Sequence, residues 1–219
     1  MSIPQTTDAV LFDFDGTLAP NLNLADMRRQ IVNLTVDAGV PNAVYKNLYI
    51  VEVIEAGFKW LIERDAERAA HYQQTANQRI LDIEMNAASA TQLFPGVKTM
   101  LTRLRQRSIG IGIVTRNCRA AIETIFPDLG QFVDALHARD DVIHLKPDPR
   151  HLLDNLQALK ARPEHSVMVG DGALDMQAGT ALNMHCIGVL TGSNGSAALK
   201  RAGAAQILDD CLSLHNAIS

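Results

Sequence analysis

The chain has 219 residues, of which 47% are hydrophobic and 20% are charged, and its formal net charge at pH 7 is −4. This composition is typical of a globular protein with a full apolar core. The acidic balance gives no broad attraction for nucleic acid or for an anionic membrane surface, so we expect neither as a partner.

Short apolar runs predict six β-strands, over residues 10–12, 109–114, 132–136, 167–169, 186–190 and 206–208. Runs of this length without polar alternation are typical of strands buried on both faces, as in a parallel sheet. Helical patterns lie between them, over residues 97–106, 119–125, 150–161, 174–181 and 196–202. Because strands and helices alternate, we predict an α/β fold with a doubly wound, mainly parallel sheet.

The segment between the first two strands departs from this alternation. It contains no convincing strand, and its helical patterns cover residues 24–38, 43–64 and 67–90. The glycines and prolines at 39–41 and 95–96 interrupt or end these patterns. We therefore predict an α/β core made of residues 1–18 and 94–219, with an inserted all-helical domain over residues 19–93. A helical layer packed permanently on the core is the alternative.

Two pairs of aspartates directly follow predicted strands. Asp13 and Asp15 lie in the sequence DFDGTL, and Asp171 and Asp175 lie in GDGALD. In an open α/β sheet the functional crevice lies at the carboxyl ends of the strands. Carboxylates gathered there repel one another and need a cation, and their hard oxygen atoms suit Mg²⁺. One aspartate after a strand is often a helix N-cap, but two such pairs favour a metal site.

Thr115 and Lys146 complete the set of candidates. Thr115 ends the strand predicted at 109–114, and its hydroxyl group can donate a hydrogen bond to a phosphoryl oxygen. Lys146 lies in the sequence HLKPDP, where the prolines restrict the chain. A lysine fixed beside carboxylates can offset their negative charge. Alone, each residue is more often a turn residue or a solvated surface charge.

Taken in order, DFDGTL, the strand that ends at Thr115, KPDP with Lys146, and GDGALD resemble the motifs of the haloacid dehalogenase superfamily. The insertion between the first two motifs is similar to the helical cap of phosphoglycolate phosphatase-like members. The resemblance covers nearly the whole chain. It implies a Rossmann-like catalytic core, a cap over residues 19–93, and phosphatase activity that depends on Mg²⁺.

The resemblance also assigns roles. Asp13 would be the nucleophile that forms an aspartyl-phosphate, and Asp15 would act as general acid and then as general base. Thr115 and Lys146 would fix the phosphoryl group. The implied metal site uses Asp13, the backbone carbonyl of Asp15, Asp171, and Asp175 either directly or through water. Arg116 and Asn117, which continue the second motif, are candidates for binding the rest of the substrate.

We expect the substrate to be a small phosphorylated metabolite. A phosphomutase, which shares the chemistry of Asp13 and Asp15, and a non-catalytic phosphate-binding regulatory protein are the alternatives. Asp15 argues against dehalogenation, which has no use for this second carboxylate. The three scattered cysteines form no CxxC pair, and no secretion signal or long apolar run is visible. A cytoplasmic location is therefore expected.

Overall fold

The computed structural model describes residues 6–214. Within this range the chain divides into two compact units, one made of residues 22–87 and the other of the remaining residues on both sides. We call them the helical unit and the core unit. The limits of the helical unit fall inside the expected limits of 19 and 93.

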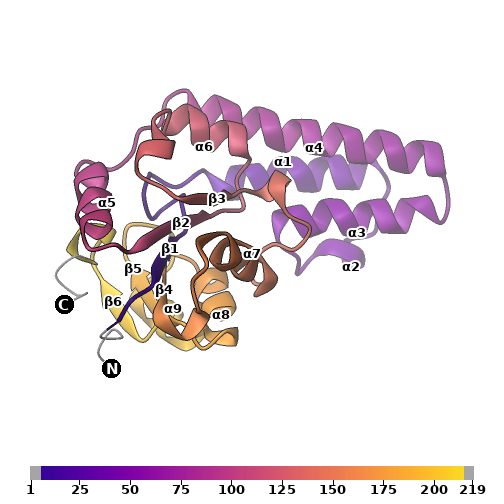
Figure 1. The fold of residues 1–219 in the computed structure, drawn as a ribbon. Coiled ribbons are helices and arrows are strands. Elements are labelled where there is room, and N and C mark those ends of the chain that lie inside the picture. The colour runs from indigo at the N-terminus through magenta and orange to yellow at the C-terminus, as the bar shows by residue number, and fades with distance from the viewer. Residues whose placement is uncertain (1–5, 215–219) are drawn as a thin grey trace. The chain divides into compact units, whose positions relative to one another are not determined.

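A six-stranded sheet forms the centre of the core unit (Figure 1). Its strands are β1 (Ala9–Phe12), β2 (Gly110–Val114), β3 (Ala135–His137), β4 (Ser166–Gly170), β5 (His185–Val189) and β6 (Gln206–Leu208). They are parallel throughout, in the order β3-β2-β1-β4-β5-β6. This arrangement confirms the predicted parallel α/β fold. The third strand begins three residues later than the predicted range of 132–136. The N–H groups of Phe132 and Val133 bond back to the carbonyl oxygen of Leu129, so these residues continue the turn of the short 3₁₀ helix at 129–131.

The register of the three central strands brings their carboxyl ends together. Phe12 of β1 lies opposite Ile113 of β2 and Val169 of β4. Every residue of β1 and β4 is buried, which explains why their sequences are apolar without alternation. The residues that follow these three strands therefore emerge at one edge of the sheet.

Helices cover both faces of this sheet. They are α5 (Val97–Gln106), α6 (Arg119–Ile125), α7 (Arg150–Leu159), α8 (Ala173–Ala181) and α9 (Ser196–Ala202), with short 3₁₀ helices η1 (Leu129–Gln131), η2 (Arg139–Asp141), η3 (Pro163–His165) and η4 (Cys211–Ser213). Figure 1 shows α7, α8 and α9 gathered on one side of the sheet. Under them, side chains of β1, β4 and β5 such as Leu11, Met168 and Cys186 join Leu156 and Met176 in one apolar cluster.

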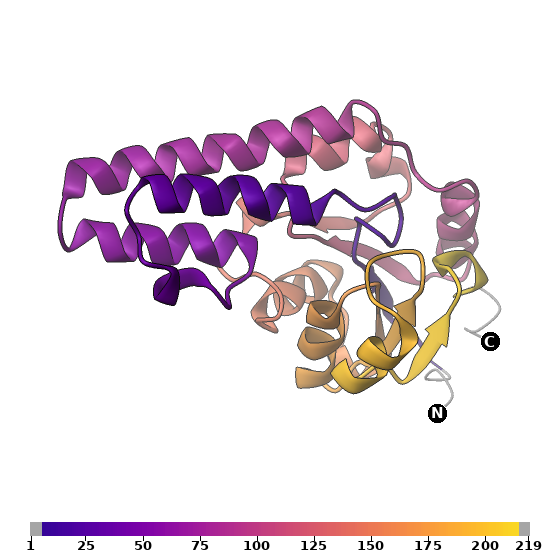
Figure 2. The same cartoon turned by 180° about the vertical axis from the view of Figure 1, so that it is seen from behind.

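The helical unit contains α1 (Leu24–Asp37), α2 (Asn42–Tyr45), α3 (Ile50–Ile62) and most of α4 (Ala66–Ala88). Figure 2 shows α1, α3 and α4 running alongside one another. The expectation of one continuous helix over residues 43–64 is wrong, since the chain breaks between α2 and α3. Arg28 donates hydrogen bonds to the carbonyl oxygens of Lys46 and Leu48, which a continuous helix would pair with later N–H groups.

A buried hydroxyl pair ties the three long helices of this unit together. Thr35 Oγ1 of α1 lies 2.9 Å from the hydroxyl oxygen of Tyr72 in α4. The Tyr72 hydroxyl also lies 3.4 Å from the carbonyl oxygen of Val53 in α3. Gly57 makes room for this ring, because a Cβ atom there would lie 2.6 Å from the Tyr72 oxygen. The unit therefore has its own apolar core with a satisfied polar contact inside it.

The chain leaves the core unit and returns to it at neighbouring points. The backbone N–H of Phe94 donates to the carbonyl oxygen of Leu18, at 2.9 Å.

Polar and charged residues recur along α4, the longest of the helices. Among residues 6–214, no helix combines the length and apolarity needed to cross a membrane.

We predict that Gly112→Ala will destabilise the core unit. A Cβ atom at Gly112 would overlap the side-chain oxygen of Asn155 and lie 2.6 Å from Leu11 Cδ2. Overpacking of this kind costs about 1–3 kcal/mol. The measurement is urea unfolding followed by circular dichroism. Gly130→Ala is the matched control, because no atom lies within 4 Å of a Cβ at that position. Equal unfolding midpoints for the two variants would contradict the prediction.

Candidate active site

The predicted site residues begin at the ends of neighbouring strands. Asp13 follows β1, Thr115 follows β2, and Asp171 follows β4. The backbone N–H of Asp13 donates to the Val169 carbonyl oxygen at 2.9 Å, which continues the ladder between β1 and β4 by one residue. The sheet therefore fixes the backbone of Asp13 at the edge where functional groups of α/β folds gather.

Three carboxylates form a compact cluster at this edge. One oxygen atom from each of Asp13, Asp171 and Asp175 lies within 4.8 Å of the other two. Asp171 and Asp175 are buried, at 4% and 2% relative exposure. Burial, followed by repulsion from the Asp13 carboxylate, raises the pKa of Asp171 to about 6 and also raises the pKa of Asp175. The cluster therefore concentrates negative charge where water is scarce.

Lys146 supplies a buried positive charge to this cluster. Its side chain is 2% exposed, and Nζ lies 2.8 Å from Asp13 Oδ1 and 2.6 Å from Asp175 Oδ1. Burial alone would lower the pKa of Lys146, but the two carboxylates outweigh it and raise this pKa. Lys146 therefore stays charged and links the loop after β1 to the start of α8.

Asp175 uses both oxygens within the protein. Oδ1 accepts from Lys146, and Oδ2 accepts from the backbone N–H of Gly172 at 2.9 Å. Gly170 allows this close packing, because a Cβ atom there would overlap the Asp175 carboxylate. The geometry of Asp175 therefore suits a supporting role better than that of a primary metal ligand.

Asp171 is held by two loops that the sequence did not indicate. The backbone N–H of Ser193 donates to Asp171 Oδ2 at 2.9 Å, and Asn21 Nδ2 lies 3.4 Å from the same oxygen. Thr191 Oγ1 donates to the carbonyl oxygen of Gly16 at 2.6 Å. Gly16 has a φ angle of 81°, and a Cβ atom there would lie 2.7 Å from Asp171 Cγ. One feature of the sequence could have indicated that the 190–194 loop contacts the site: this loop directly follows β5, so it lies at the same edge of the sheet.

Asp15 is engaged by Asn117. The amide nitrogen Nδ2 of Asn117 lies 3.2 Å from Asp15 Oδ1 and 3.1 Å from Asp15 Oδ2. The neighbouring Arg116 donates from Nη1 to the carbonyl oxygen of Lys146. The hydroxyl oxygen of Thr115 accepts from the backbone N–H of Asn117 at 3.1 Å. The structure therefore brings all of the predicted site residues into two linked groups, one around Lys146 and one around Asn117.

A neutral histidine accepts a hydrogen bond from the backbone of Lys146. His151 is fully buried, and its Nδ1 accepts from the backbone N–H of Lys146 at 3.2 Å. Its Nε2 lies 3.1 Å from the carbonyl oxygen of His137, so the proton of the neutral ring is on Nε2. Burial, followed by the charge of Lys146, lowers the pKa of His151 to about 3. Sequence reasoning missed this residue, which lies in the first turn of α7.

The carboxylate cluster has the composition of a magnesium site. Asp13 and Asp171 contribute hard oxygen atoms, and the bonds described for Asp171 all end on Oδ2. Mg²⁺ is bound by one or two carboxylates and keeps positions for water and for a phosphate oxygen. A divalent cation would also relieve the repulsion that raises the pKa of Asp171. The residues present therefore fit this ion.

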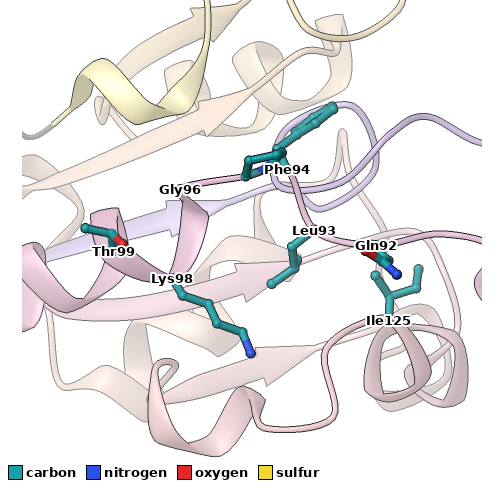
Figure 3. A pocket seen from close by; sticks show the side chains of 8 residues that line it. Gln92, Leu93, Phe94, Gly96, Lys98, Thr99 and Ile125 are labelled. Atoms are coloured by element: carbon teal, nitrogen blue, oxygen red, sulfur yellow. The ribbon is translucent and has the colours of Figure 1, made fainter.

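A separate pocket of about 360 Å³ lies around the first turn of α5 (Figure 3). Its lining residues are Gln92, Leu93, Phe94, Pro95, Gly96, Lys98, Thr99 and Ile125. The ammonium group of Lys98 lies 2.6 Å from the carboxylate of Asp128. None of the lining residues belongs to the carboxylate cluster, so this pocket is distinct from the candidate active site.

Comparison with known proteins gives relatives for this chain. It is 30% identical to a phosphoglycolate phosphatase from Xanthomonas campestris over 191 residues, which cover 84% of this chain and 83% of the relative. It is 28% identical to a pyrophosphatase from Oceanobacillus iheyensis over 182 residues, with 82% of each chain covered. A β-phosphoglucomutase from Clostridium difficile has a similar fold, with a TM-score of 0.68, 17% identity, and coverage of 95% of this chain and 93% of its own.

The family match covers most of the core unit and the whole helical unit. Residues 10–189 match the haloacid dehalogenase-like hydrolases, and this range includes the four motifs and the carboxylate cluster. The resemblance that the motifs indicated is therefore confirmed. The chain belongs to the haloacid dehalogenase-like hydrolase family.

Proposed function

We propose that this protein is a Mg²⁺-dependent phosphatase that hydrolyses a small phosphomonoester through an aspartyl-phosphate on Asp13. The observation that carries this proposal is the environment of Asp13. Its carboxylate lies at a strand end, is paired with the buried Lys146, and is close to Asp171. The charge of Lys146 lies beside the attacking carboxylate, and these surroundings suit a phosphate group accompanied by a cation.

In the first step, an Asp13 oxygen forms a bond to phosphorus as the bond between phosphorus and the leaving oxygen breaks. Asp15, in its protonated form, gives its proton to that oxygen, and the alcohol departs. In the second step, Asp15 takes a proton from water as the water oxygen bonds to phosphorus. The Asp13–phosphorus bond then breaks, which releases inorganic phosphate, restores the Asp13 carboxylate and leaves Asp15 protonated for the next cycle. One residue thus acts as acid and then as base.

Thr115 and Lys146 act on the phosphoryl group in this proposal. Because Thr115 Oγ1 already accepts from the backbone N–H of Asn117, its own proton is directed elsewhere and can be donated to a phosphoryl oxygen. Lys146 donates to Asp13, and its charge offsets the negative charge that gathers during attack. Both groups are buried, so they act where electrostatic interactions are strong.

Asp13 and Asp171 would bind Mg²⁺ together with the backbone carbonyl of Asp15, and Asp175 would support the site through Lys146 and Gly172. When bound, Mg²⁺ would supply positive charge that offsets the phosphate dianion and the charge of the transition state. Asn21 and Ser193 hold Asp171 Oδ2, and none of the bonds described for this carboxylate uses its other oxygen.

The helical unit is inserted in the chain at the position expected for a cap that selects the substrate. It is inserted after Asn21, a few residues beyond Asp13 and Asp15. Closing caps commonly exclude bulk water and favour small substrates. The named relatives act on phosphoglycolate or pyrophosphate, so a small phosphorylated metabolite is the substrate class that we propose. A β-phosphoglucomutase shares the fold, and analysis of the products separates phosphate release from phosphoryl transfer to a second hydroxyl.

The roles of the two aspartates should separate in phosphate-trapping experiments. Asp13→Asn should reduce turnover to background and form no phosphoenzyme, because the attacking charge is lost while the shape is kept. Asp15→Asn should still be phosphorylated by an aryl phosphate, since a good leaving group needs little protonation, and should then accumulate the phosphoenzyme. Acid quenching with labelled substrate measures both. Activity of Asp13→Asn above about a hundredth of wild type would contradict the proposal.

Metal removal should abolish hydrolysis. Without a divalent cation, the cluster of Asp13, Asp171 and Asp175 repels a phosphate dianion, so chelation should stop turnover and added Mg²⁺ should restore it. Ca²⁺ should restore it poorly, because it prefers more ligands at longer distances. Initial rates with a small phosphoester, measured at matched concentrations of free ion, test this. Full activity in the presence of a chelator would exclude the proposed role of the metal.

Lys146→Met should reduce both activity and stability, and a second change should separate the two effects. Loss of the cation should lower kcat/KM by about 10²–10³-fold, which is typical of removing one electrostatic contact to the transition state. It should also leave Asp175 buried without its partner, at a cost of about 3–5 kcal/mol. Lys146→Met with Asp175→Asn should recover stability in urea unfolding with chelator present, but not activity. Equal stability of the single and double variants would contradict this assignment.

A further inference from the structure

Asn117 follows β2 closely and donates to the Asp15 carboxylate, and its backbone is fixed on both sides. It is 3% exposed. Its N–H donates to Thr115 Oγ1 at 3.1 Å, and its carbonyl oxygen accepts from the backbone N–H of Arg139 at 3.0 Å. The residue is therefore held in one position before any substrate binds.

The orientation of the Asn117 amide is fixed as well. Its side-chain oxygen accepts from the backbone N–H of Cys118 at 2.8 Å. The amide nitrogen must then face Asp15, where it lies 3.2 Å and 3.1 Å from the two carboxylate oxygens. In the reverse orientation, the amide oxygen would face the Asp15 carboxylate and the amide nitrogen would face the N–H of Cys118. Both contacts would be lost, so charge and hydrogen bonding support the same assignment.

This contact restrains both oxygens of Asp15. An aspartate can rotate about two side-chain bonds, and Asp15 is only partly buried, so burial alone does not fix it. A donor shared between both oxygens holds the plane of the carboxylate. General acid–base catalysis needs the oxygen within hydrogen-bond reach of the reacting group, and a misplacement of about 1 Å can cost on the order of a hundredfold in rate.

We propose that Asn117 is a positioning residue that holds Asp15 for proton transfer, and that it does not bind the substrate. This inference rests on the proposed function. It replaces the expectation that Asn117 contacts the part of the substrate beyond the phosphoryl group. Because its backbone N–H also holds Thr115 Oγ1, one residue sets the geometry of the acid–base group and of a phosphoryl donor together.

The first test is Asn117→Ala with a series of substrates that differ in leaving group. For an alkyl phosphate, which needs protonation, kcat/KM should fall by on the order of a hundredfold. For an activated aryl phosphate the first step should change little. The slowed attack of water should then produce a burst of the alcohol product and an accumulated phosphoenzyme. A raised KM with an unchanged dependence on the leaving group would mean direct substrate binding and would overturn the proposal.

The second test asks whether Asn117 acts through Asp15. In the Asp15→Asn background there is no carboxylic acid left to position, so adding Asn117→Ala should change the rate of phosphoenzyme hydrolysis, measured after phosphorylation by the aryl phosphate, by less than about threefold. The double-mutant cycle measures this coupling. Fully multiplicative effects of the two substitutions would show that they act independently and would also overturn the proposal.

Asn155→Ala is the matched control, because Asn155 is another buried asparagine of the core unit whose amide bonds to the backbone of Ile113 at 3.0 Å. It should lower stability without changing the dependence on the leaving group. The same change in that dependence in both variants would mean general loosening of the core and would overturn the proposal. Failure of the proposed function is seen separately, in wild-type protein that forms no phosphoenzyme.

Discussion

The structure of the candidate active site depends on the two ion pairs of Lys146. Carboxylates that end neighbouring strands would repel one another, and burial makes the repulsion stronger. Lys146 lies between Asp13 and Asp175, within 2.8 Å of both, and is itself held by His151. One residue therefore connects three elements: its side chain bonds to the loop after β1 and to the start of α8, and its backbone N–H bonds to the start of α7. The charge that lies beside Asp13 also holds these elements together.

The parallel sheet is what makes this arrangement possible from residues far apart in the sequence. Because β2, β1 and β4 are neighbours in register, the residues after them meet without long connecting loops. Glycines then allow the loops to approach the carboxylates closely, at Gly16 beside Asp171 and at Gly170 beside Asp175. The site is therefore formed by backbone geometry first and by side-chain contacts second.

Much of this could be predicted from the sequence, for physical reasons that differ between elements. Strands β1 and β4 were clear because burial on both faces leaves an unbroken apolar run, AVLF in β1 and VMV in β4. The break between α2 and α3 could not be seen, because it depends on Arg28, a residue of another helix. The contacts of Asn21 and Ser193 with Asp171 were hidden for the same reason. Asn117 was noticed, but its partner Asp15 lies about a hundred residues away in the sequence, and spacing alone cannot pair them.

The backbone bond between Phe94 and Leu18 has a consequence for how this protein can change over evolutionary time. It closes the chain at the base of the insertion, so the helical unit is topologically a long loop whose ends are already joined. The entropy of closing a loop grows only slowly with its length. Insertions of different size or sequence can therefore be exchanged at this point at little cost to the core. Such exchanges leave Asp13, Lys146 and Asp171 unchanged, because all three belong to the core unit.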